Sequence, residues 1–514
     1  MGCSNSKTVE NNENTNNSTS NTKSSRKKET GFNSHTNTLK LNSILNNDKL
    51  ENNYKAIEKL GTGSFGKVYR VNHLKSGQDR ALKVVNKAII KYQDDEKTFL
   101  KEIELLSQLD HPSIIKVYEY FVENNNYYVV QEYCRGGELY EQIYKIDCFT
   151  EKSAAIIMKQ LLSAVFYLHS VNIVHRDLKP ENIMLENDEE TDNFIIKLID
   201  FGTANYFEQG KTLSQKVGTS LYIAPEVVLK KYNEKCDVWS CGVILYILLC
   251  GFPPYDGDTD EDIMESVVRD EVSYDEQEWE NISPEAINFL KKLLHKDYKK
   301  RITAEEALQE PWLLKTAEST HSESELKNIH SQLQNFQKFD AKQKLKHSIL
   351  AFMVHHLATE EMTKDLKDTF KRMDKSNDGR LSLQELIEGI RETLKNNNKG
   401  ELFNEEDIIR RFKAIDTDAS NYIEIEEFIT VTISEELLLN EKNLKLTFDY
   451  FDKDKSGCLD VSEIESLLQS RGKEEDKAMV KELIAKYDTN KDGVLSFDEF
   501  KELIKEYNPN LKLS

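Results

Sequence analysis

The chain has 514 residues, a size that predicts several domains. Its formal net charge of −21 argues against a nucleic-acid-binding protein, and no stretch approaches the roughly 18 apolar residues of a membrane span. The seven cysteines are scattered without a CxxC pair, which favours a reduced intracellular chain. No apolar segment typical of a secretory signal follows Met1.

Residues 1–53 are rich in Asn, Ser, Thr and Lys and are expected to form a disordered tail. Gly2 and Cys3 fit an N-myristoylation pattern with a palmitoylatable cysteine beside it. Because one myristoyl chain anchors a protein only marginally, Cys3 acylation would provide the second signal. The alternative is a chance Met-Gly start on a soluble tail. The pattern predicts the cytoplasmic face of a membrane, with the plasma membrane favoured, together with the cytoplasm.

Residues 54–313 begin with short β-like runs and continue with longer helical patterns, which is an α+β order. The predicted strands are Tyr54–Leu60, Lys67–Asn72, Arg80–Val85, Ile115–Val122 and Tyr127–Glu132. The predicted helices include Lys97–Leu109, Ala154–His169 and Asp237–Cys250.

A glycine-rich loop joins the first two strands, where glycines let backbone N–H groups approach phosphate oxygens. Its spacing also opens dinucleotide-binding folds, but there a helix follows and here a strand does. Lys83 on the third strand could bridge phosphates if a carboxylate orients it. Glu102 is the first choice for that carboxylate and Glu104 the second. Taken alone, Lys83 could also be a solvent-exposed lysine.

Three further motifs follow in order: His175-Arg176-Asp177-Leu-Lys179-Pro-Glu181-Asn182, then Asp200-Phe201-Gly202, then Ala224-Pro225-Glu226. With the glycine-rich loop and Lys83 they resemble the eukaryotic protein kinases, and the DLKPEN string resembles the serine/threonine branch. The resemblance implies a catalytic set of Asp177, Lys83, Glu102, Lys179, Asn182 and Asp200.

The resemblance also implies roles for individual residues. Asp177 would orient the substrate hydroxyl and accept its proton, while Asn182 and Asp200 would hold Mg²⁺. Val68, Ala81 and Met184 would sandwich adenine. The implied ATP-binding residues are Leu60, Gly61, Thr62, Gly63, Ser64, Phe65, Gly66, Lys67, Val68, Ala81, Lys83, Glu132, Cys134, Glu138, Met184 and Asp200. A pseudokinase kept for binding is the alternative, but no catalytic position is missing.

Two positions bear on specificity and regulation. Glu138 and Glu181 resemble acids that accept basic side chains upstream of the target Ser or Thr; the alternative is that both are ordinary surface acids. Gln215 stands where many kinases place a phosphorylated or acidic residue to pair with Arg176, so the need for phosphorylation is left open.

Four twelve-residue repeats match the EF-hand calcium loop, beginning at Asp374, Asp416, Asp452 and Asp488. Side chains at positions 1, 3, 5 and 12 and the carbonyl at position 7 would supply the oxygens that Ca²⁺ requires. The predicted ligands are Asp374, Ser376, Asp378, Arg380, Ser382 and Glu385; Asp416, Asp418, Ser420, Tyr422, Glu424 and Glu427; Asp452, Asp454, Ser456, Cys458, Asp460 and Glu463; and Asp488, Asn490, Asp492, Val494, Ser496 and Glu499.

One loop departs from the pattern, because Asn421 stands where glycine is expected. Asn tolerates the left-handed conformation best after Gly, so we expect loop two to bind calcium, with lower affinity than the others. The apolar residue at position 8 of each loop is expected to pair neighbouring hands through a short β-bridge.

Residues 314–360 form a charged, amphipathic connector between the two regions. Apolar side chains recur at helical spacing in two runs: Leu326, Ile329, Leu333, Phe336 and Phe339, then Leu345, Ile349, Phe352, Met353 and Leu357. Nearby basic residues suit an acidic, calmodulin-like partner. The alternative is a plain linker helix packed permanently on the kinase.

This arrangement resembles the calcium-dependent protein kinases of plants and protists, in which the connector blocks the kinase and the calmodulin-like domain relieves the block. The implied fold is a bilobal kinase followed by an all-α domain with hands at 361–396, 403–438, 439–474 and 475–510. We expect a monomer that phosphorylates protein substrates with upstream basic residues and binds no nucleic acid. A calcium-buffering scaffold and a kinase driven by separate calmodulin are the weaker alternatives.

Overall fold

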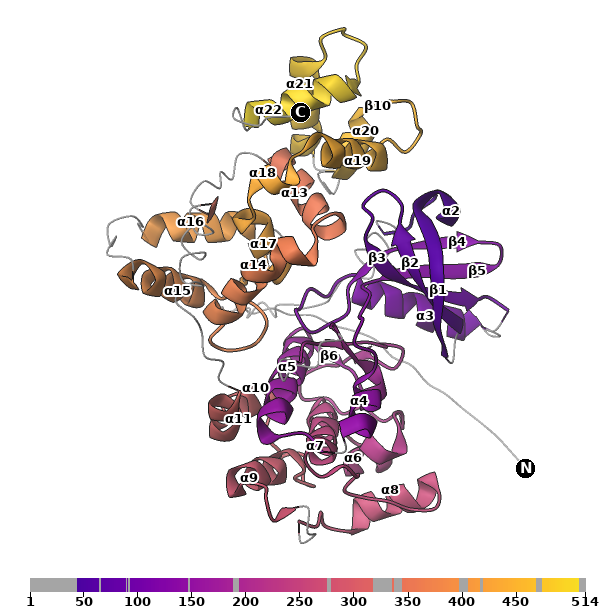
Figure 1. Ribbon diagram of the computed structural model, residues 1–514, viewed down its shortest axis with the longest axis vertical. Helices are drawn as coiled ribbons and strands as arrows, with labels where there is room; N and C mark the ends of the chain where they lie inside the picture. The colour runs from indigo at the N-terminus through magenta and orange to yellow at the C-terminus, as the bar shows by residue number, and fades with distance from the viewer. Residues whose placement is uncertain are drawn as a thin grey trace, which may run out of the picture.

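A computed structural model gives the arrangement of the chain (Figure 1). It describes residues 44–63, 66–88, 90, 93–146, 148–187, 194–274, 279–317, 335–336, 344–396, 405–416, 419–467 and 474–507. Gly2, Cys3, Ser64, Phe65 and Asp418 therefore lie outside the described residues, as does most of the connector before Lys344.

The first lobe is a five-stranded antiparallel sheet in the order β1-β2-β3-β5-β4 with one long helix, α3. Burial alternates along the strands, as expected for a sheet with one face on a core. Its elements are β1 (Tyr54–Gly63), β2 (Gly66–His73), β3 (Asp79–Asn86), α3 (Gln93–Leu106), β4 (Val117–Glu123) and β5 (Asn126–Gln131).

Two boundaries differ from the predictions. β4 begins at Val117 and not at Ile115, because the Ile115 amide donates to Leu198 in the second lobe. The helix predicted to end at Leu109 ends at Leu106. A turn follows in which the Gln108 and Leu109 amides donate to carbonyls three residues earlier, and it leads to the Asp110-His111-Pro112 segment. A residue before proline disfavours the helical conformation, which fits a helix that ends ahead of Pro112.

The residues just before β1 belong to the fold, which corrects the expectation of a disordered tail up to residue 53. Leu45 pairs with Tyr120 of β4, and Asn46 donates to Glu119. The short helix α2 (Leu50–Asn53) follows. The physical reason is that β4 is the edge strand, whose backbone groups are open to an additional segment.

The second lobe is mainly helical and is built around α5 and α7. α7 is buried on all sides, so its uniform apolarity reflects a core helix, and no helix among the described residues has the length and apolarity to span a membrane. The helices are α4 (Leu139–Ile146), α5 (Glu151–Ser170), α6 (Pro225–Val228), α7 (Lys235–Cys250), α8 (Asp260–Arg269), α9 (Pro284–Leu293), α10 (Ala304–Leu308) and α11 (Pro311–Thr316).

Two short strand pairs lie in this lobe beside the cleft. β6 (Ile173–Val174) pairs with β9 (Asn205–Tyr206), and β7 (Ile183–Leu185) pairs with β8 (Ile196–Leu198). The segment from Val174 to Ile183 is thereby held at both ends, which places the predicted catalytic residues between the lobes.

The C-terminal region is all-α apart from one short strand pair, so the α+β kinase followed by an all-α domain is confirmed. β10 (Cys458–Leu459) and β11 (Leu495–Ser496) pair hands three and four, and a Leu381–Ile423 bridge pairs hands one and two. The helices are α13 (Lys344–His356), α14 (Glu360–Met373), α15 (Leu383–Asn396), α16 (Glu405–Ile415), α17 (Ile425–Thr432), α18 (Glu435–Leu438), α19 (Glu441–Phe451), α20 (Val461–Leu467), α21 (Glu474–Tyr487) and α22 (Phe497–Tyr507).

The described part of the connector, α13, packs with the EF-hand region and not with the kinase core. Its side chains Leu345, Ile349 and Met353 are buried in one hydrophobic cluster with residues of all four hands. The kinase region has a separate cluster that includes no residue of α13. A plain linker helix packed with its stripe on the kinase core is therefore not what the described residues show.

Candidate active site and calcium loops

The Lys83 ammonium and the Glu102 carboxylate meet across the first lobe, 3.0 Å apart. Lys83 lies on β3 between Val68 of β2 and Val129 of β5, while Glu102 projects from α3 and is buried. Burial disfavours the charge, but the carboxylates of Glu102 and Asp200 outweigh it and raise the pKa of Lys83. Lys83 is thus held charged and oriented, and the structure places Glu102, not Glu104, against it.

The predicted adenine face lies on the same side of the sheet as Lys83. Val68 pairs directly with Lys83, and Ala81 lies two residues before it, so the three side chains share one face. Met184 approaches from β7, where it forms an isolated bridge with Glu138. At Gly66 an added Cβ would lie 1.8 Å from the Val84 carbonyl oxygen, so only glycine fits there.

The hinge between the lobes contains Glu132 and Cys134. The Glu132 amide donates to the Lys116 carbonyl, and its side chain pairs with Lys197 at 3.0 Å. Cys134 is buried, and its surroundings raise the pKa of the thiol, chiefly through burial. This cysteine is therefore held as a neutral thiol at the edge of the cleft.

Asp177 stands at the centre of a hydrogen-bonded cluster. Its Oδ2 lies 3.0 Å from Lys179 Nζ, and its Oδ1 accepts from the Thr219 hydroxyl at 2.8 Å. Lys179 also donates to the Thr219 hydroxyl, and Asn182 Nδ2 donates to the Asp177 carbonyl at 2.9 Å. An aspartate held in this way can orient a substrate hydroxyl and accept its proton.

Asp200 and Asn182 provide oxygen ligands on the same side of the cleft. Asp200 adopts a positive φ of 62°, and its Oδ1 accepts from the Gly202 amide at 3.2 Å. Asp200 raises the pKa of Lys83, and the Asn182 carbonyl accepts from the Ile199 amide next to Asp200 at 2.8 Å. A carboxylate and a side-chain amide oxygen fit Mg²⁺, which prefers oxygen ligands together with substrate phosphates. When bound there, Mg²⁺ neutralises phosphate charge.

Asp237, which the sequence reasoning did not single out, fixes the backbone of the catalytic loop. It is fully buried on α7, and its two oxygens accept from the amides of His175 and Arg176 at 2.9 and 2.8 Å. The His175 ring also packs edge-on against Phe201 at 4.8 Å. Asp237 supports the positive φ of 72° at Arg176. Its position as an aspartate inside an apolar helix could have marked it in the sequence as a buried, hydrogen-bonded residue.

Two further residues missed from sequence are Thr219 and Arg301. Thr219 bridges Asp177 and Lys179, and its place shortly before Ala224-Pro225-Glu226 was a usable signal. Arg301 is fully buried and forms a two-pronged ion pair with Glu226, at 2.5 and 2.9 Å. No local motif marks Arg301, because its partner lies 75 residues away.

Arg176 is satisfied without phosphate. Its Nη1 donates to the Gln215 side-chain oxygen at 3.1 Å, and its Nε donates to the Thr203 carbonyl at 2.7 Å. The Tyr232 hydroxyl donates to the Gln215 carbonyl at 2.8 Å and so ties the same segment down. The sequence left open which group pairs with Arg176. In the structure the neutral side-chain amide of Gln215 takes that place.

The four calcium loops share one internal geometry. In each, the amide at position 6 donates to Oδ2 of the position-1 aspartate, at 2.8 to 2.9 Å. Asn421 does this with a φ of 68°, close to the glycines of the other loops. Asparagine therefore adopts the left-handed conformation that loop two requires, as expected.

Loop one brings Asp374, Asp378 and Glu385 together in a buried site. Burial raises the pKa of Asp374 to about 7, and the carboxylates of Asp378 and Glu385 add to the effect. A buried carboxylate whose pKa is raised by neighbouring carboxylates fits a divalent cation, which would neutralise the clustered charge. In loop three, ligand oxygens of Asp452, Asp454 and Glu463 lie within 4.8 Å of one another.

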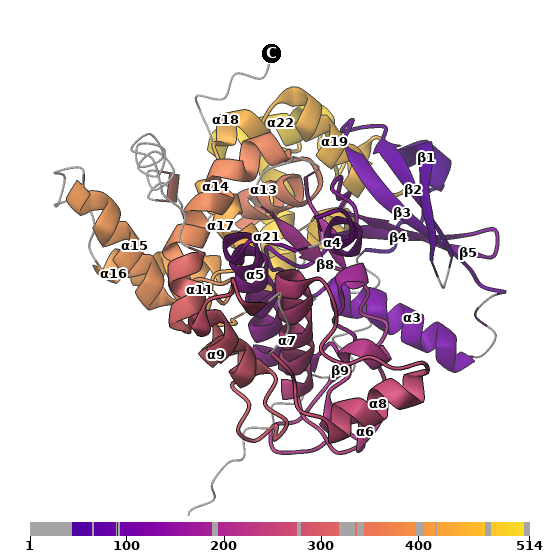
Figure 2. The same ribbon diagram turned by 60° about the horizontal axis from the view of Figure 1, so that its bottom comes forward.

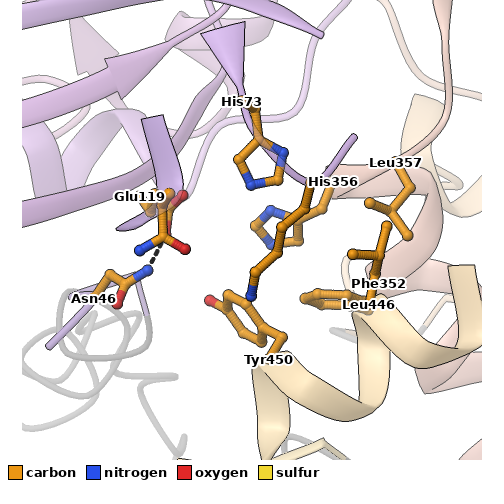
Figure 3. Close-up of a pocket in the computed structure, with 10 residues that line it drawn as sticks. Asn46, His73, Glu119, Phe352, His356, Leu357, Leu446 and Tyr450 are labelled. Carbon is orange, nitrogen blue, oxygen red and sulfur yellow. Dashed lines mark hydrogen bonds between the residues drawn. The ribbon is translucent and has the colours of Figure 1, made fainter. Parts of the chain in front are cut away.

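The connector and the second EF-hand pair also touch the first lobe (Figure 3). Asn46, His73, Glu119, His356 and Tyr450 line a pocket of about 20 Å³ there, which is room for about one water molecule. His73 and His356 come from the kinase and from α13, and Tyr450 from α19. Three separate parts of the chain therefore meet at this surface.

The end of α13 is capped by the kinase. Arg80 Nη2 donates to the His356 carbonyl at 2.7 Å, and Gln78 Nε2 donates to the carbonyls of Leu357 and Ala358 at 3.2 and 3.0 Å. Arg80 is almost fully buried and stacks on Tyr118 at 3.8 Å. A cation at a helix C-terminus complements the orphan carbonyls and the helix dipole.

Comparison with known proteins agrees with this site. Residues 54–313 match the protein kinase domain, residues 441–505 match the EF-hand domain pair, and residues 366–390 and 408–432 each match the EF hand. Calcium-dependent protein kinase 4 of Plasmodium falciparum is 42% identical over 391 residues, which cover 75% of this chain and 74% of the relative. The chain belongs to the calcium-dependent protein kinase family.

Two further relatives support the same assignment. Calcium-dependent protein kinase 5 of Plasmodium berghei is 35% identical over 77% of this chain and 68% of its own length. Calcium-dependent protein kinase 14 of Arabidopsis thaliana is 32% identical over 75% and 70%. This calcium-dependent protein kinase is a protein serine/threonine kinase that uses ATP and Mg²⁺ and binds Ca²⁺ through its EF-hands.

Proposed function

We propose that this kinase is an autoinhibited monomer whose connector blocks activity until calcium binds the chain's own EF-hands. The observation that carries the proposal is the position of α13: its apolar side chains lie in the EF-hand core, while its last carbonyls are capped by Arg80 and Gln78 of the kinase. A change in the hands is thereby transmitted to the lobe that holds Lys83.

The physical basis is the behaviour of sensor EF-hands. They expose an apolar groove when calcium binds, and α13 supplies a helix with a matching apolar stripe. Lys346 pairs with Glu435 at 2.6 Å, which adds charge complementarity to the groove. Without calcium the groove closes, and the connector is free to occupy the kinase instead.

The decisive experiment compares peptide phosphorylation by the full chain in saturating calcium and in excess chelator. We expect strong activity only with calcium. Equal rates under both conditions would end the proposal. Truncation after Ala317 gives a second test, in which we expect calcium-independent activity from a product whose circular dichroism confirms folding. A folded but inactive product would instead mean that the connector is needed for catalysis.

We propose, in addition, that substrates carry basic residues upstream of the target Ser or Thr. Glu181 Oε2 is buried and has no hydrogen-bond partner among the described residues, and burial together with Glu141 and Glu181 raises the pKa of Glu138. A guanidinium between these carboxylates would satisfy the orphan oxygen and relieve the repulsion. Peptide-library profiling should show an Arg or Lys preference that Glu181→Gln weakens; a flat profile in both proteins would exclude it.

The N-terminal tail is proposed to anchor the kinase at the cytoplasmic face of a membrane, with the plasma membrane favoured. The support is the Gly2-Cys3 pair, which suits myristoylation and palmitoylation. In cells, Gly2→Ala should move the protein to the soluble fraction, and Cys3→Ser should weaken retention. An unchanged distribution of both variants would favour the soluble alternative.

A further inference from the structure

A kinase surface that includes Asp110 and Tyr167 contacts the calcium loops of the first EF-hand pair. Tyr167, on α5, donates from its hydroxyl to Glu424 Oε1 at 3.2 Å, and the same hydroxyl accepts from the Asp110 amide at 3.1 Å. Glu424 is position 9 of loop two. Figure 2 shows α14 and α17 beside α5, away from the cleft between the lobes.

A second contact reaches the helix that leaves loop two. Asp110 Oδ2 accepts from the Glu426 amide at 2.8 Å, in the first turn of α17. The Glu426 side chain pairs with Lys116 of the kinase and with His355 Nδ1 of α13 at 3.0 Å. Asp110 thus satisfies an orphan amide of α17, and Glu426 joins the kinase, the connector and hand two.

The third contact involves loop one. The Arg380 guanidinium lies over the rings of Tyr167 and Tyr422, at 5.4 and 4.0 Å from their centroids. It also pairs with Asp378, a predicted ligand, at 3.3 Å. Gly379 packs so closely on His111 that an added Cβ would lie 2.1 Å from the ring. Both loops of the pair therefore meet one rigid kinase surface.

We propose that Tyr167 and Asp110 form a docking surface that reads calcium occupancy of the first EF-hand pair, chiefly through loop two. Tyr167 is 1% exposed on a long helix, so the packing around its ring fixes the position of its hydroxyl. Glu424 meets this hydroxyl in the conformation of loop two described here, so a change in that loop would alter the contact. Since binding energies are reciprocal, docking raises the calcium affinity of loop two by the factor by which calcium favours docking.

This inference rests on the proposed calcium switch but is narrower, because it assigns the coupling to named residues of one pair. The two residues of the proposed docking surface, Tyr167 and Asp110, lie outside the catalytic cleft. Loss of the Tyr167 hydroxyl should leave the Lys83–Glu102 pair and the Asp177 cluster untouched, since neither contains Tyr167. Nucleotide KM at saturating calcium should therefore be unchanged.

The test compares the full chain with Tyr167→Phe, which keeps the ring and removes the hydroxyl. Calcium binding is measured by isothermal titration, and activation by the calcium concentration that gives half-maximal peptide phosphorylation. We expect one class of sites to weaken and half-activation to rise about tenfold, the effect of losing one hydrogen bond to a charged group. Hydrogen exchange at residues 425–432 should speed up in saturating calcium.

Tyr246→Phe is the matched control, because Tyr246 is equally buried and its hydroxyl donates within the kinase to the Ser273 carbonyl at 3.1 Å. It should bind calcium like the wild type. Glu426→Gln repeats the test from the EF-hand side, at position 11 of the loop, and should also raise the calcium requirement.

The outcomes separate the two proposals. If the wild type is switched by calcium while Tyr167→Phe and Glu426→Gln both bind calcium and activate as it does, the docking surface is wrong and the switch stands. If the wild type is equally active with and without calcium, the proposed switch itself fails, and the docking surface has no function to serve.

Discussion

The two EF-hand pairs share one loop pattern but differ in what covers them. In loop one, Asp378 and Gly379 are buried, and Gly379 meets His111 of the kinase. In the second pair, Gly457 and Gly493 occupy the same loop position, but a Cβ added at either would meet no atom within 4 Å, and Asp492 is exposed. Equal sequence motifs thus stand in different dielectric surroundings.

The pKa of one ligand carboxylate is shifted in opposite directions in loops one and four. Burial raises the pKa of Asp374 in loop one to about 7, whereas hydrogen bonds from Thr489 lower the pKa of Glu499 in loop four to about 2. In loop one, a bound cation would offset the cost of burying the Asp374 charge beside the carboxylates of Asp378 and Glu385. Because its two loops also meet His111 and Tyr167 of the kinase, the first pair is the better placed of the two to report calcium to the kinase.

The largest effect is expected from Asp177→Asn, which should nearly abolish catalysis without changing calcium binding by either EF-hand pair. Asp177→Asn should reduce peptide phosphorylation at saturating calcium by about 10²–10⁴-fold or more, because a general base and its Lys179 pair are lost. Calcium titration should show both pairs binding as in the wild type. Asp258→Asn, an exposed change, is the control. Wild-type activity in Asp177→Asn would end the assignment of Asp177.

Arg80→Met tests the capped end of α13 while keeping the aliphatic stem. It removes the bonds to the His356 carbonyl and the Tyr54 hydroxyl, each worth about 1.5–3 kcal/mol for a charged donor. We expect a higher calcium concentration for half-activation. Arg269→Met, whose exposed side chain pairs with Asp270 just after α8, should behave as the wild type. Identical curves for both variants would mean that the cap is not part of the switch.

The pairs can be compared directly through their position-12 ligands. Glu385→Gln and Glu499→Gln should each weaken calcium binding in their own loop, by about tenfold or more for loss of a charged bidentate ligand. Among the described residues, the first pair and not the second meets Tyr167 and Asp110. Glu385→Gln should therefore raise the calcium requirement of the kinase more than Glu499→Gln does. A larger shift from Glu499→Gln would mean that the second pair, and not the first, reports calcium to the kinase.

The smallest effect is expected at Gln215. Gln215→Ala removes one neutral acceptor from Arg176, which keeps the Thr203 carbonyl, so kcat should fall by less than about tenfold. Phosphatase treatment of the wild type should leave kcat unchanged, because Arg176 already has partners. A large loss on dephosphorylation would show that the activation segment needs a phosphate after all.

Much of the cleft could be predicted because its chemistry is encoded in short motifs. The glycine-rich loop, Lys83, Asp177 and Asp200 lie in local patterns whose order along the chain implies one arrangement. Glu102 was preferred over Glu104 on the same basis. Arg301 was missed because its partner Glu226 is distant in sequence and leaves no local pattern. Asp237 left a local signal, as an aspartate in an apolar helix, but its partners in the catalytic loop are distant in sequence.

The sequence by itself determined the kinase and EF-hand assignments, the four calcium loops and the amphipathic connector, because each depends on residue types at fixed spacing. Only the tertiary structure decided that α13 lies in the EF-hand core, that Arg80 caps it, and that Tyr167 meets loop two. The contacts of Arg80 and Tyr167 join residues 276 and 257 positions apart, and their geometry depends on how two separately folded cores pack together.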